Sequence, residues 1–569
     1  MKKILFYLAS ILVFSSCGIF DFFTESVTST ATKKAITLSI DNNSNSAYEA
    51  YAIFTNEEYY SYAGQIKITS NNINSSLNNY MANYNINTLG NDDIIKHPVF
   101  YNNGKLIREK SIENTISYNI RASITNTSYT EGSKEEFYAL YAGTGDYYKE
   151  NNELNKKQAT LKKQVNNIEV KVENNNSSTR TLNIWVADDV WETVVTQEMI
   201  DALADKFLKT GFDNDIYDWV TNIYGDEWFE GNDEYTNTID GNKEINILIY
   251  NINEGNNSNG SYLGFFDSTH NFINNENNKY SNEKIMFFID SGNLAKKDEN
   301  SNWDITYVDK EGKGPAIILS TLAHEFTHMI IFYQKYYNQD INIDSWINEM
   351  CAMTTEDILA NKLGINNPIN IRQDEFSLYS NSYPVNEWTN STLHYANKYF
   401  FGAFLLRNFG VGIFHDIATN EYNGITAIEK ALEKNGYNIK FEELLKYWGE
   451  AILTSDKYEL DYVYSSKDLS YNGITYRVAP INVVDNKNYK NIIFYGLDDS
   501  SAPDLDLGAN IYYKLTPYSI VSDSEWDITI PSGVGINIII KDSLGNFKTK
   551  EYFEAEAIKN NNNFILEIK

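Results

Sequence analysis

The sequence has little cysteine, histidine or proline. Its 569 residues include 2 cysteines, 6 histidines and 8 prolines. Two cysteines, Cys17 and Cys351, cannot build a disulfide framework. With 42% apolar and 14% aromatic residues, the chain is neither disordered nor collagen-like. A folded protein of about three or four domains is expected from this length.

Basic residues are also scarce. Lys and Arg number 47 against 77 Asp and Glu, which gives a net charge of -30. A surface with this excess repels phosphate backbones, so no nucleic-acid partner is expected. Because net charge far from zero favours solubility, we interpret the excess in that way rather than as a specific acidic binding face.

The N-terminal segment is typical of an export signal. Lys2 and Lys3 precede an apolar run at residues 4–14, and small residues follow it up to Cys17. The run is too short to cross a bilayer as a helix. Its end resembles a bacterial lipobox, with Phe14 where an aliphatic residue is usual. The resemblance implies a lipoprotein-type signal at residues 1–17, with lipid attached to Cys17.

An ordinary cleaved secretory signal is the alternative. Both interpretations predict export, either to the cell envelope as a lipoprotein of the outer membrane or cell surface, or into the medium. A membrane partner is therefore expected through the lipid anchor alone, because one or two acyl chains can hold a protein that has no transmembrane helix.

Hydrophobic periodicity divides the rest of the chain into regions. In residues 18–34 a few aromatic residues give way to small and polar ones, and we interpret this segment as a tether. Alternating apolar and polar residues predict a β-rich domain at 35–178, mixed patterns fill 179–470, and alternation returns in a small β domain at 471–569. The expected fold class is multidomain α+β. Strands of the two β domains are predicted at 36–40, 65–68, 116–120, 168–172, 511–515 and 536–540.

Two consecutive helices are predicted in the middle region. Pro315 occupies a first-turn position and begins an apolar helix that runs to about residue 335. Ser345 can cap a second helix at 346–363, which Gly364 ends. Other elements of this region are predicted as strands at 182–187, 245–252, 262–266 and 285–289, and as helices at 197–208 and within 392–454.

The first of these helices carries an HExxH motif. His324 and His328 stand at positions i and i+4 of one helix face, close enough to share a metal ion, and Glu325 lies beside them within reach of a metal-bound water. The apolar residues fall on the opposite face, which predicts one side in the core and one side lining a polar site. A hydrogen-bonded pair of core histidines is the alternative.

A catalytic zinc site needs a third protein ligand and an open position. Ile331 and Gln334 stand where a metzincin has its glycine and third histidine, which excludes that group. On the second helix, Glu349 and Glu356 interrupt an apolar flank, and a buried carboxylate needs a metal, a cation or hydrogen-bond donors. We predict Glu349 as the third zinc ligand and Glu356 as the acceptor of a ligating imidazole N–H. Solvated helix positions are the alternative for both.

These residues resemble a known group. HExxH followed by the Trp-x-Asn-Glu segment at 346–349 resembles the gluzincin metallopeptidases, and residues 324–330 with Gln334-Lys335 are most similar to the hyicolysin family of bacterial zinc peptidases, over about 180–455. The resemblance implies a mixed sheet with a helical subdomain, one zinc ion held by His324, His328 and Glu349, and Glu325 as the catalytic acid/base. Met350 and Met353 stand where many gluzincins have glycine or aspartate, so the role of Glu356 departs from the family pattern.

The resemblance also implies an oxyanion donor and a substrate edge. Tyr399, in Tyr-Phe-Phe-Gly, resembles the Y-x-x-G stretch in which aminopeptidase-like gluzincins carry a tyrosine that binds the tetrahedral intermediate. Tyr395 and His394 are rival donors, and a core role for Tyr399 is equally open. An extended peptide is expected to add to a sheet edge before the metal helix, at 262–266 or 285–289.

Together these features predict an exported, lipid-anchored zinc endopeptidase that cleaves extracytoplasmic proteins with Glu325 as general acid/base. An aminopeptidase would also need a group that binds the free amine of its substrate. The sequence shows no motif for such a group, so an endopeptidase is favoured. The alternative is a surface adhesin or scaffold lipoprotein with a structural or inactive zinc site, which would need no base at Glu325. No motif supports calcium binding by the acidic loops. Structural or surface roles are predicted for Cys351, His97, His270 and His415.

Overall fold

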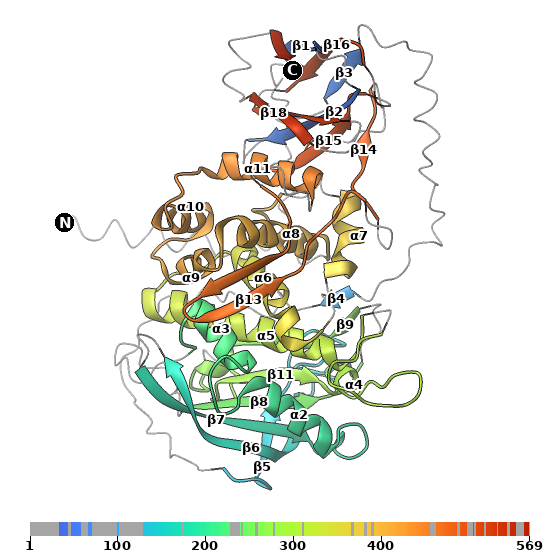
Figure 1. Ribbon diagram of the computed structural model, residues 1–569. Coiled ribbons are helices and arrows are strands. Elements are labelled where there is room, and N and C mark those ends of the chain that lie inside the picture. Colours follow the sequence, from blue (N-terminus) through green and yellow to red (C-terminus); the bar gives the residue numbers. More distant parts are fainter. Residues whose placement is uncertain are drawn as a thin grey trace, which may run out of the picture.

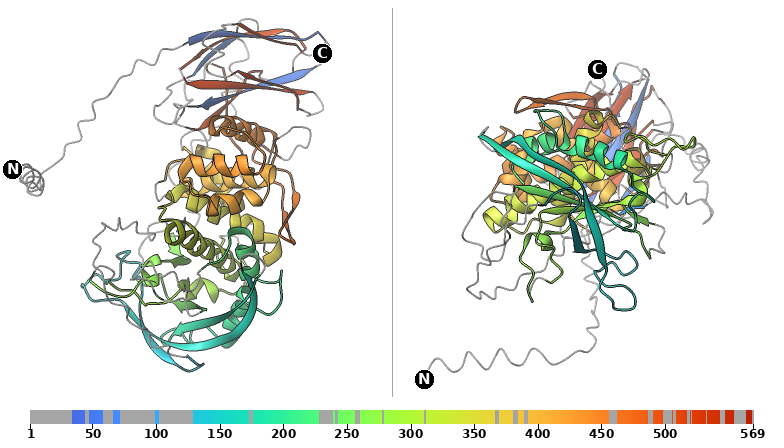
Figure 2. Two further views of the ribbon diagram at one scale, coloured as in Figure 1. Left: turned by 90° about the vertical axis from the view of Figure 1, so that its left-hand side faces the viewer. Right: turned by 90° about the horizontal axis from the view of Figure 1, so that it is seen from below.

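The computed structural model stacks three tiers along one axis, a curled sheet, a layer of helices and a β-sandwich (Figures 1 and 2). It describes residues 34–43, 47–57, 66–70, 99–101 and most of 129–567, where the longest gap is 228–238. The predicted signal at 1–17, nearly all of the tether and the strand at 116–120 lie outside the described residues.

The lower tier is a mixed six-stranded sheet in the order β10-β11-β8-β7-β6-β5. Neighbours β7 and β8, and β8 and β11, are parallel, and the remaining pairs are antiparallel. Strands β8 and β11 are buried along almost their whole length, as expected where a sheet is covered on both faces. The strands are β5 (Lys134–Tyr138), β6 (Lys156–Val172), β7 (Asn176–Ala187), β8 (Glu244–Tyr250), β10 (Gly264–Phe266) and β11 (Met286–Asp290).

Short helices cover this sheet, and a small strand pair lies beside it. The helices are α2 (Gln197–Phe207), α3 (Ile216–Tyr224), η3 (Ser268–Asn271) and α4 (Ser291–Leu294). Strand β4 (Val99–Tyr101) pairs in parallel with β9 (Gly260–Tyr262). The strand predicted at 262–266 is therefore divided, with Leu263 between β9 and β10.

Helix α5 (Pro315–Ile331) carries the HExxH motif and packs against β10 and β11. Gly264 makes this approach possible, because a Cβ there would lie 2.7 Å from the Phe288 carbonyl oxygen and 3.1 Å from Thr321 Cγ2. The helix continues as η4 (Phe332–Tyr337), a π-helical turn, and together they are long and apolar enough to cross a bilayer, although almost all of this length is buried inside the protein.

Every residue of α5 is buried, including those on the histidine side. Helix α6 (Ser345–Leu363) covers the histidine side, and its buried polar residues Asn348, Glu349 and Glu356 face the two histidines. Helix α6 begins after Asp344, which occupies the N-cap position predicted for Ser345, and ends at Gly364 in the left-handed conformation. This left-handed C-terminus is the one that glycine favours.

The middle tier is helical. Its remaining elements are α7 (Ile369–Tyr379), α8 (Thr392–Phe409), α9 (Gly412–Thr419), α10 (Gly424–Lys434), α11 (Phe441–Thr454) and the hairpin β12 (Lys467–Tyr471) with β13 (Ile474–Val478). Helix α6 contacts α5, α8 and β13. The ligand-bearing helices therefore lie at the centre of the protein, between the sheet and the other helices.

The upper tier is a sandwich of two sheets, ordered β19-β1-β16-β3 and β14-β15-β2-β17-β18. The strands are β1 (Lys34–Asp41), β2 (Tyr48–Asn56), β3 (Lys67–Ser70), β14 (Phe494–Tyr495), β15 (Asn510–Lys514), β16 (Ser524–Ile530), β17 (Val534–Asp542), β18 (Phe547–Phe553) and β19 (Asn563–Glu567). Both ends of the chain contribute to it.

This pairing differs from the domain layout expected from sequence. Strand β1 pairs with β16 and β19, and β2 pairs with β15 and β17, so residues 34–70 share one sandwich with residues 494–567. Strands β5 and β6, which fall in the range predicted as a separate N-terminal β domain, instead continue the sheet beneath α5 through β7. Alternation predicts strands correctly here but does not predict their partners.

Helix α11 joins the sandwich to the helical tier. Gly449 lies so close to the sandwich that a Cβ would stand 3.0 Å from Ile53 Cγ2, and Asn510 donates a hydrogen bond to the Leu445 carbonyl at 3.1 Å. Lys446 pairs with Glu57 at 3.0 Å. Ile53 belongs to the same hydrophobic core as the sheet and helices below it. One face of the sandwich therefore belongs to the main core, whereas the interior of the sandwich forms a second core that includes Phe54 and Trp526.

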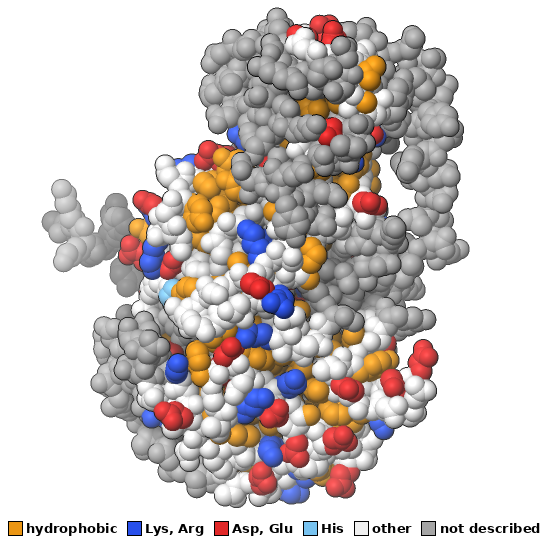
Figure 3. Space-filling model, in the orientation of Figure 1, with side chains coloured by type: hydrophobic (Ala, Val, Ile, Leu, Met, Phe, Trp, Pro, Cys, Tyr) orange, Lys and Arg blue, Asp and Glu red, His pale blue; other side chains and the backbone are white. Residues whose placement is uncertain are grey.

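Charged side chains of both signs are interspersed over the face of the lower tier that Figure 3 shows. Some pair across neighbouring strands, as Lys156 does with Glu136 at 2.6 Å, and Lys157 contacts Glu254 at 2.7 Å. Mixed charge of this kind is in keeping with the interpretation of the net charge as a contribution to solubility.

We predict that Ile53→Ala lowers the free energy of unfolding by about 2–5 kcal/mol, because it removes a fully buried side chain from the main core. Urea unfolding followed by tryptophan fluorescence measures the change. Val521→Ala is the control, since Val521 is 57% exposed in the same tier and its truncation should change the free energy by less than about 0.5 kcal/mol. An unaltered transition in Ile53→Ala would show that this face of the sandwich does not belong to the main core.

Candidate metal centre

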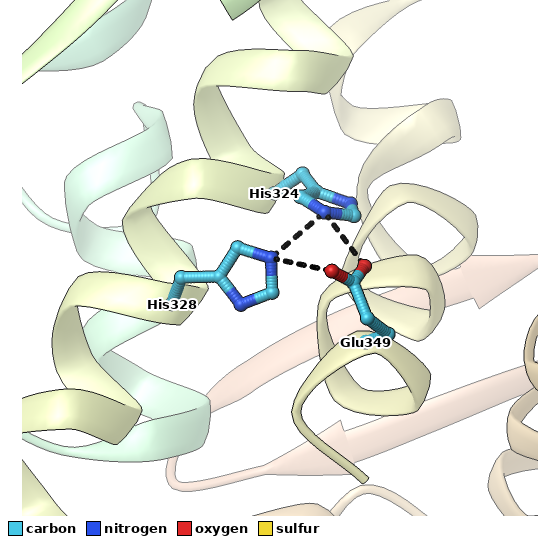
Figure 4. A group of neighbouring side chains, drawn as sticks. All are labelled: His324, His328 and Glu349. Atoms are coloured by element: carbon cyan, nitrogen blue, oxygen red, sulfur yellow. Dashed lines mark hydrogen bonds and ion pairs between the residues drawn. The ribbon is translucent and has the colours of Figure 1, made fainter. Parts of the chain in front are cut away.

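His324, His328 and Glu349 converge between α5 and α6 (Figure 4). The two Nε2 atoms are 3.0 Å apart, His324 Nε2 lies 3.4 Å from Glu349 Oε2, and His328 Nε2 lies 3.7 Å from Glu349 Oε1. All three side chains are buried. Within the described residues this is the one group of three or more His, Cys, Asp or Glu side chains arranged to hold a metal ion. We call these three residues the metal centre.

The donor atoms fit a zinc ion. Zinc bonds of about 2.0–2.1 Å in a tetrahedron place ligand atoms about 3.4 Å apart, close to the three separations observed. Both carboxylate oxygens of Glu349 are buried and have no hydrogen-bond partner in the described part of the chain. Because a buried carboxylate without hydrogen bonds is costly, the two oxygens need a cation between them and the neighbouring histidines. Two imidazoles and a carboxylate also form a common catalytic zinc set.

The outer nitrogens of both histidines are held by hydrogen bonds. His324 Nδ1–H donates to Glu356 Oε1 at 2.8 Å, and His328 Nδ1–H donates to Asn348 Oδ1 at 2.9 Å. These bonds fix both rings with Nε2 toward the centre. The contact predicted for Glu356 is present. Asn348 was missed, although it lies in the Trp-x-Asn-Glu segment, because a single amide beside a ligand carries no distinctive sequence signal.

The Nε2 atoms of the two histidines face each other at hydrogen-bond distance, so a proton on one of them would compete with a metal ion for this position. Burial opposes a charge on His324, but Glu349 and Glu356 outweigh it and raise its pKa to about 10. Burial lowers the pKa of His328 to about 4. His324 is therefore the donor of the pair, and a metal ion would take the place of its proton.

Glu325 lies beside the metal centre and is also buried. Its Oε2 accepts a hydrogen bond from the Phe266 N–H of β10 at 2.9 Å, whereas Oε1 has no hydrogen-bond partner among the described residues. Burial and the negative charge of Glu349 raise the pKa of Glu325 to about 7, against the opposing effect of His324. A carboxyl group with such a pKa is suited to taking up and releasing a proton near neutral pH.

Of the two segments predicted as a substrate edge, β10 is the terminal strand of the sheet and β11 is the second. The prediction for residues 285–289 is therefore corrected, because β8 and β10 occupy both sides of β11. The Phe266 N–H contact places the end of β10 directly against Glu325.

The three rival oxyanion donors lie on α8. Tyr399 is fully buried, and its ring centroid lies 5.4 Å from the Arg372 guanidinium carbon. Arg372 contacts Glu356, which links Tyr399 indirectly to the metal centre. Tyr395 packs edge-on against Trp388, and His394 Nδ1–H donates to the Glu387 carbonyl at 3.0 Å. The oxyanion role stays a prediction for all three.

The remaining residues predicted to be structural have structural contacts where they are described. Burial raises the pKa of the Cys351 thiol to about 12, so the thiol is inert at neutral pH. His270 contacts the Tyr147 hydroxyl at 3.0 Å, and burial lowers its pKa to about 4. His415 Nδ1–H donates to the Ile223 carbonyl at 3.1 Å. Cys17 and His97 lie outside the described residues.

Two histidines one helical turn apart, a glutamate from the next helix and a buried carboxylate beside them are the arrangement of an HExxH metallohydrolase centre. The profile of the Peptidase M30 family matches residues 156–458, just over half of the chain, and the chain belongs to this family. This membership confirms the resemblance to the hyicolysin family.

The match extends from β6 to just beyond α11, and so contains the whole metal centre and excludes the sandwich. A neutral metalloprotease, ShpI, from Staphylococcus hyicus is 24% identical to this chain over 263 residues, which are 45% of this chain and 52% of that protein. The chain thus spans about half the length of this relative.

We predict that zinc binding at pH 7 releases at least about one proton per ion, because the ion replaces the proton of His324. The pKa of His324 is raised to about 10 when no ion is bound. At pH 7 the competing proton is therefore present on His324, and it is lost only as the pH rises toward that value. The apparent affinity should therefore rise about tenfold per pH unit between pH 7 and 9. Calorimetric titration in buffers of different ionisation enthalpy measures the proton count. Zinc binding without proton release would contradict the assignment.

Proposed function

We propose that the protein is an exported, lipid-anchored zinc endopeptidase that hydrolyses peptide bonds in extracytoplasmic proteins. The observation that carries the proposal is the Glu325 carboxylate, buried beside a complete three-ligand centre with Oε1 lacking a hydrogen-bond partner in the described chain. Membership of the Peptidase M30 family supports metal-dependent peptidase chemistry. A structural or inactive site in an adhesin or scaffold would need no base at this position.

The mechanism divides between the ion and the side chains. Zinc, when bound to His324, His328 and Glu349, supplies Lewis acidity and lowers the pKa of water to about 7. Glu325 is oriented by the Phe266 N–H through Oε2, which leaves Oε1 to take a proton from the attacking water. The same carboxyl group then returns the proton to the leaving amine. Tyr399 is proposed to donate the hydrogen bond that stabilises the oxyanion of the tetrahedral intermediate, and Tyr395 and His394 are the alternative donors.

The substrate is proposed to be an extended peptide added to the edge of β10. Backbone N–H and C=O groups of an edge strand bind an extended peptide without regard to its side chains. Because Phe266 in this strand contacts Glu325, a peptide held at this edge would lie beside the catalytic carboxyl group. Export and lipid attachment at Cys17 rest on residues 1–17 of the sequence.

Residues 18–569 should bind one zinc ion and cleave unfolded casein, and Glu325→Gln should keep the metal but lower kcat at least about a hundredfold, because glutamine cannot accept the proton. Casein digestion and metal content are measured on the same samples. Glu299→Gln is the control, since Glu299 is an exposed glutamate. Full activity in Glu325→Gln would refute its role as the base.

Glu349→Ala should weaken zinc binding at least about a hundredfold, because it removes one of three protein ligands. Competition with a chromophoric chelator measures the affinity. Glu299→Ala serves as the matched control and should bind zinc like the unaltered protein. If Glu349→Ala retains its full affinity, the third ligand lies elsewhere in the chain.

A further inference from the structure

Arg372 reaches the metal centre from a third helix, α7. It is 7% exposed, and its Nη2 donates to Glu356 Oε2 at 3.1 Å and to Oε1 at 3.2 Å. The same carboxylate accepts hydrogen bonds from His324 Nδ1–H at 2.8 Å and from the Ser320 hydroxyl at 3.1 Å. We propose that Arg372 is a positioning residue for the metal, acting through Glu356 on His324. This inference rests on the proposed function.

The physical reason is the number of buried negative charges. Glu325, Glu349 and Glu356 are all nearly inaccessible to solvent and surround the same pair of histidines. Arg372 compensates the charge of Glu356 and holds both of its oxygens away from the ion. Without this cation, the Glu356 carboxylate would turn toward the nearest remaining positive charge, which is the metal itself, and His324 would lose its orienting acceptor.

The guanidinium is held in place by a second contact. It lies over the ring of Tyr399, with 5.4 Å from its central carbon to the ring centroid. A planar group can stack on an aromatic ring and donate hydrogen bonds from its edge at the same time, whereas a lysine ammonium cannot reproduce both contacts. Arginine is therefore specifically suited to this position.

The helix that carries Arg372 is anchored to the segment between β13 and β14. Gln373 Nε2 donates to the Asn482 carbonyl at 2.9 Å, and the Ser377 hydroxyl donates to the Lys490 carbonyl at 2.9 Å. The Lys490 N–H donates to Asp374 Oδ1 at 2.6 Å. Because this segment leads into the sandwich, the position of Arg372 depends on how the C-terminal part of the chain packs.

A matched ion pair on the same helix provides a control. Asp357, the residue after Glu356, is paired with Arg407 of α8, and both are fully buried. Arg407 donates its other hydrogen bonds to the carbonyls of Ala403 and Ala479. Both pairs join a buried arginine to a buried carboxylate of α6. Only the Arg372 pair contains a carboxylate, that of Glu356, that accepts a hydrogen bond from the Nδ1–H of a proposed metal ligand, His324.

The test compares Arg372→Met with Arg407→Met in residues 18–569. Three quantities are measured: zinc affinity by chelator competition, the visible spectrum of the Co²⁺-substituted protein, and the Tm of the metal-free protein. Arg372→Met should weaken zinc binding about 10–100-fold and alter the Co²⁺ spectrum. Arg407→Met should lower the Tm but leave the affinity within about threefold. Equal losses of affinity in the two variants would overturn the proposal.

A double-mutant cycle shows whether Arg372 acts through Glu356. In a Glu356→Gln background, whose neutral amide oxygen can still accept the His324 N–H, Arg372→Met should change zinc affinity by less than about threefold. An undiminished effect would overturn the proposed route. If Arg372→Met does not fold, Arg372→Lys takes its place, and unaltered affinity and Co²⁺ spectrum would overturn the positioning role. Zinc binding and casein cleavage by the unaltered protein test the proposed function separately.

Discussion

The structure depends on the burial of ionisable groups between α5 and α6. Two imidazoles and three carboxylates occupy a space almost closed to solvent. A buried cluster of ionisable side chains is stable only when its charges are balanced and its polar atoms have hydrogen-bond partners. The guanidinium of Arg372 provides positive charge beside Glu356, and the carboxylates raise the pKa of His324, which favours a proton there. A divalent ion would replace that proton and supply a cation to the otherwise unpartnered Glu349 oxygens.

The neighbouring elements all contribute contacts to this centre. Strand β10 holds Glu325 by a backbone N–H, α6 supplies Asn348 and Glu356 to the outer nitrogens of the histidines, and α7 supplies Arg372. The approach of β10 to α5 depends on Gly264. The sandwich is outside the family match and has a core of its own, but one of its faces packs into the main core beside α11.

The sequence predicts much of the centre because local spacing carries the information. Histidines four residues apart on an apolar helix must share a face, and Glu349 and Glu356 stand out against an apolar flank. Asn348 has no such contrast, and Arg372 lies 16 residues after Glu356 on a separate helix, α7, where no periodicity links the two side chains. The burial of α5 on all sides was also not predictable from its sequence. Polar residues on a helix usually face solvent, whereas those of α5 face another helix.

The strands show the same division between local and long-range information. Alternation located β1, β3, β15 and β17 within a few residues, and it located only the last five residues of β6. The partners of β1 and β2 lie more than 400 residues away, and periodicity contains no information about such pairings. For this reason the two β domains expected from sequence became one sandwich and an extension of the central sheet.

The central claim is that one divalent ion is held jointly by α5 and α6. Anomalous diffraction at the zinc absorption edge from crystals of the purified protein tests it most directly. The account predicts one strong peak per chain, about 2.0–2.1 Å from Nε2 of His324 and of His328 and about 2.0–2.2 Å from a carboxylate oxygen of Glu349. Crystals grown with zinc that show no peak between the two helices, or a peak bound by other side chains, would contradict it.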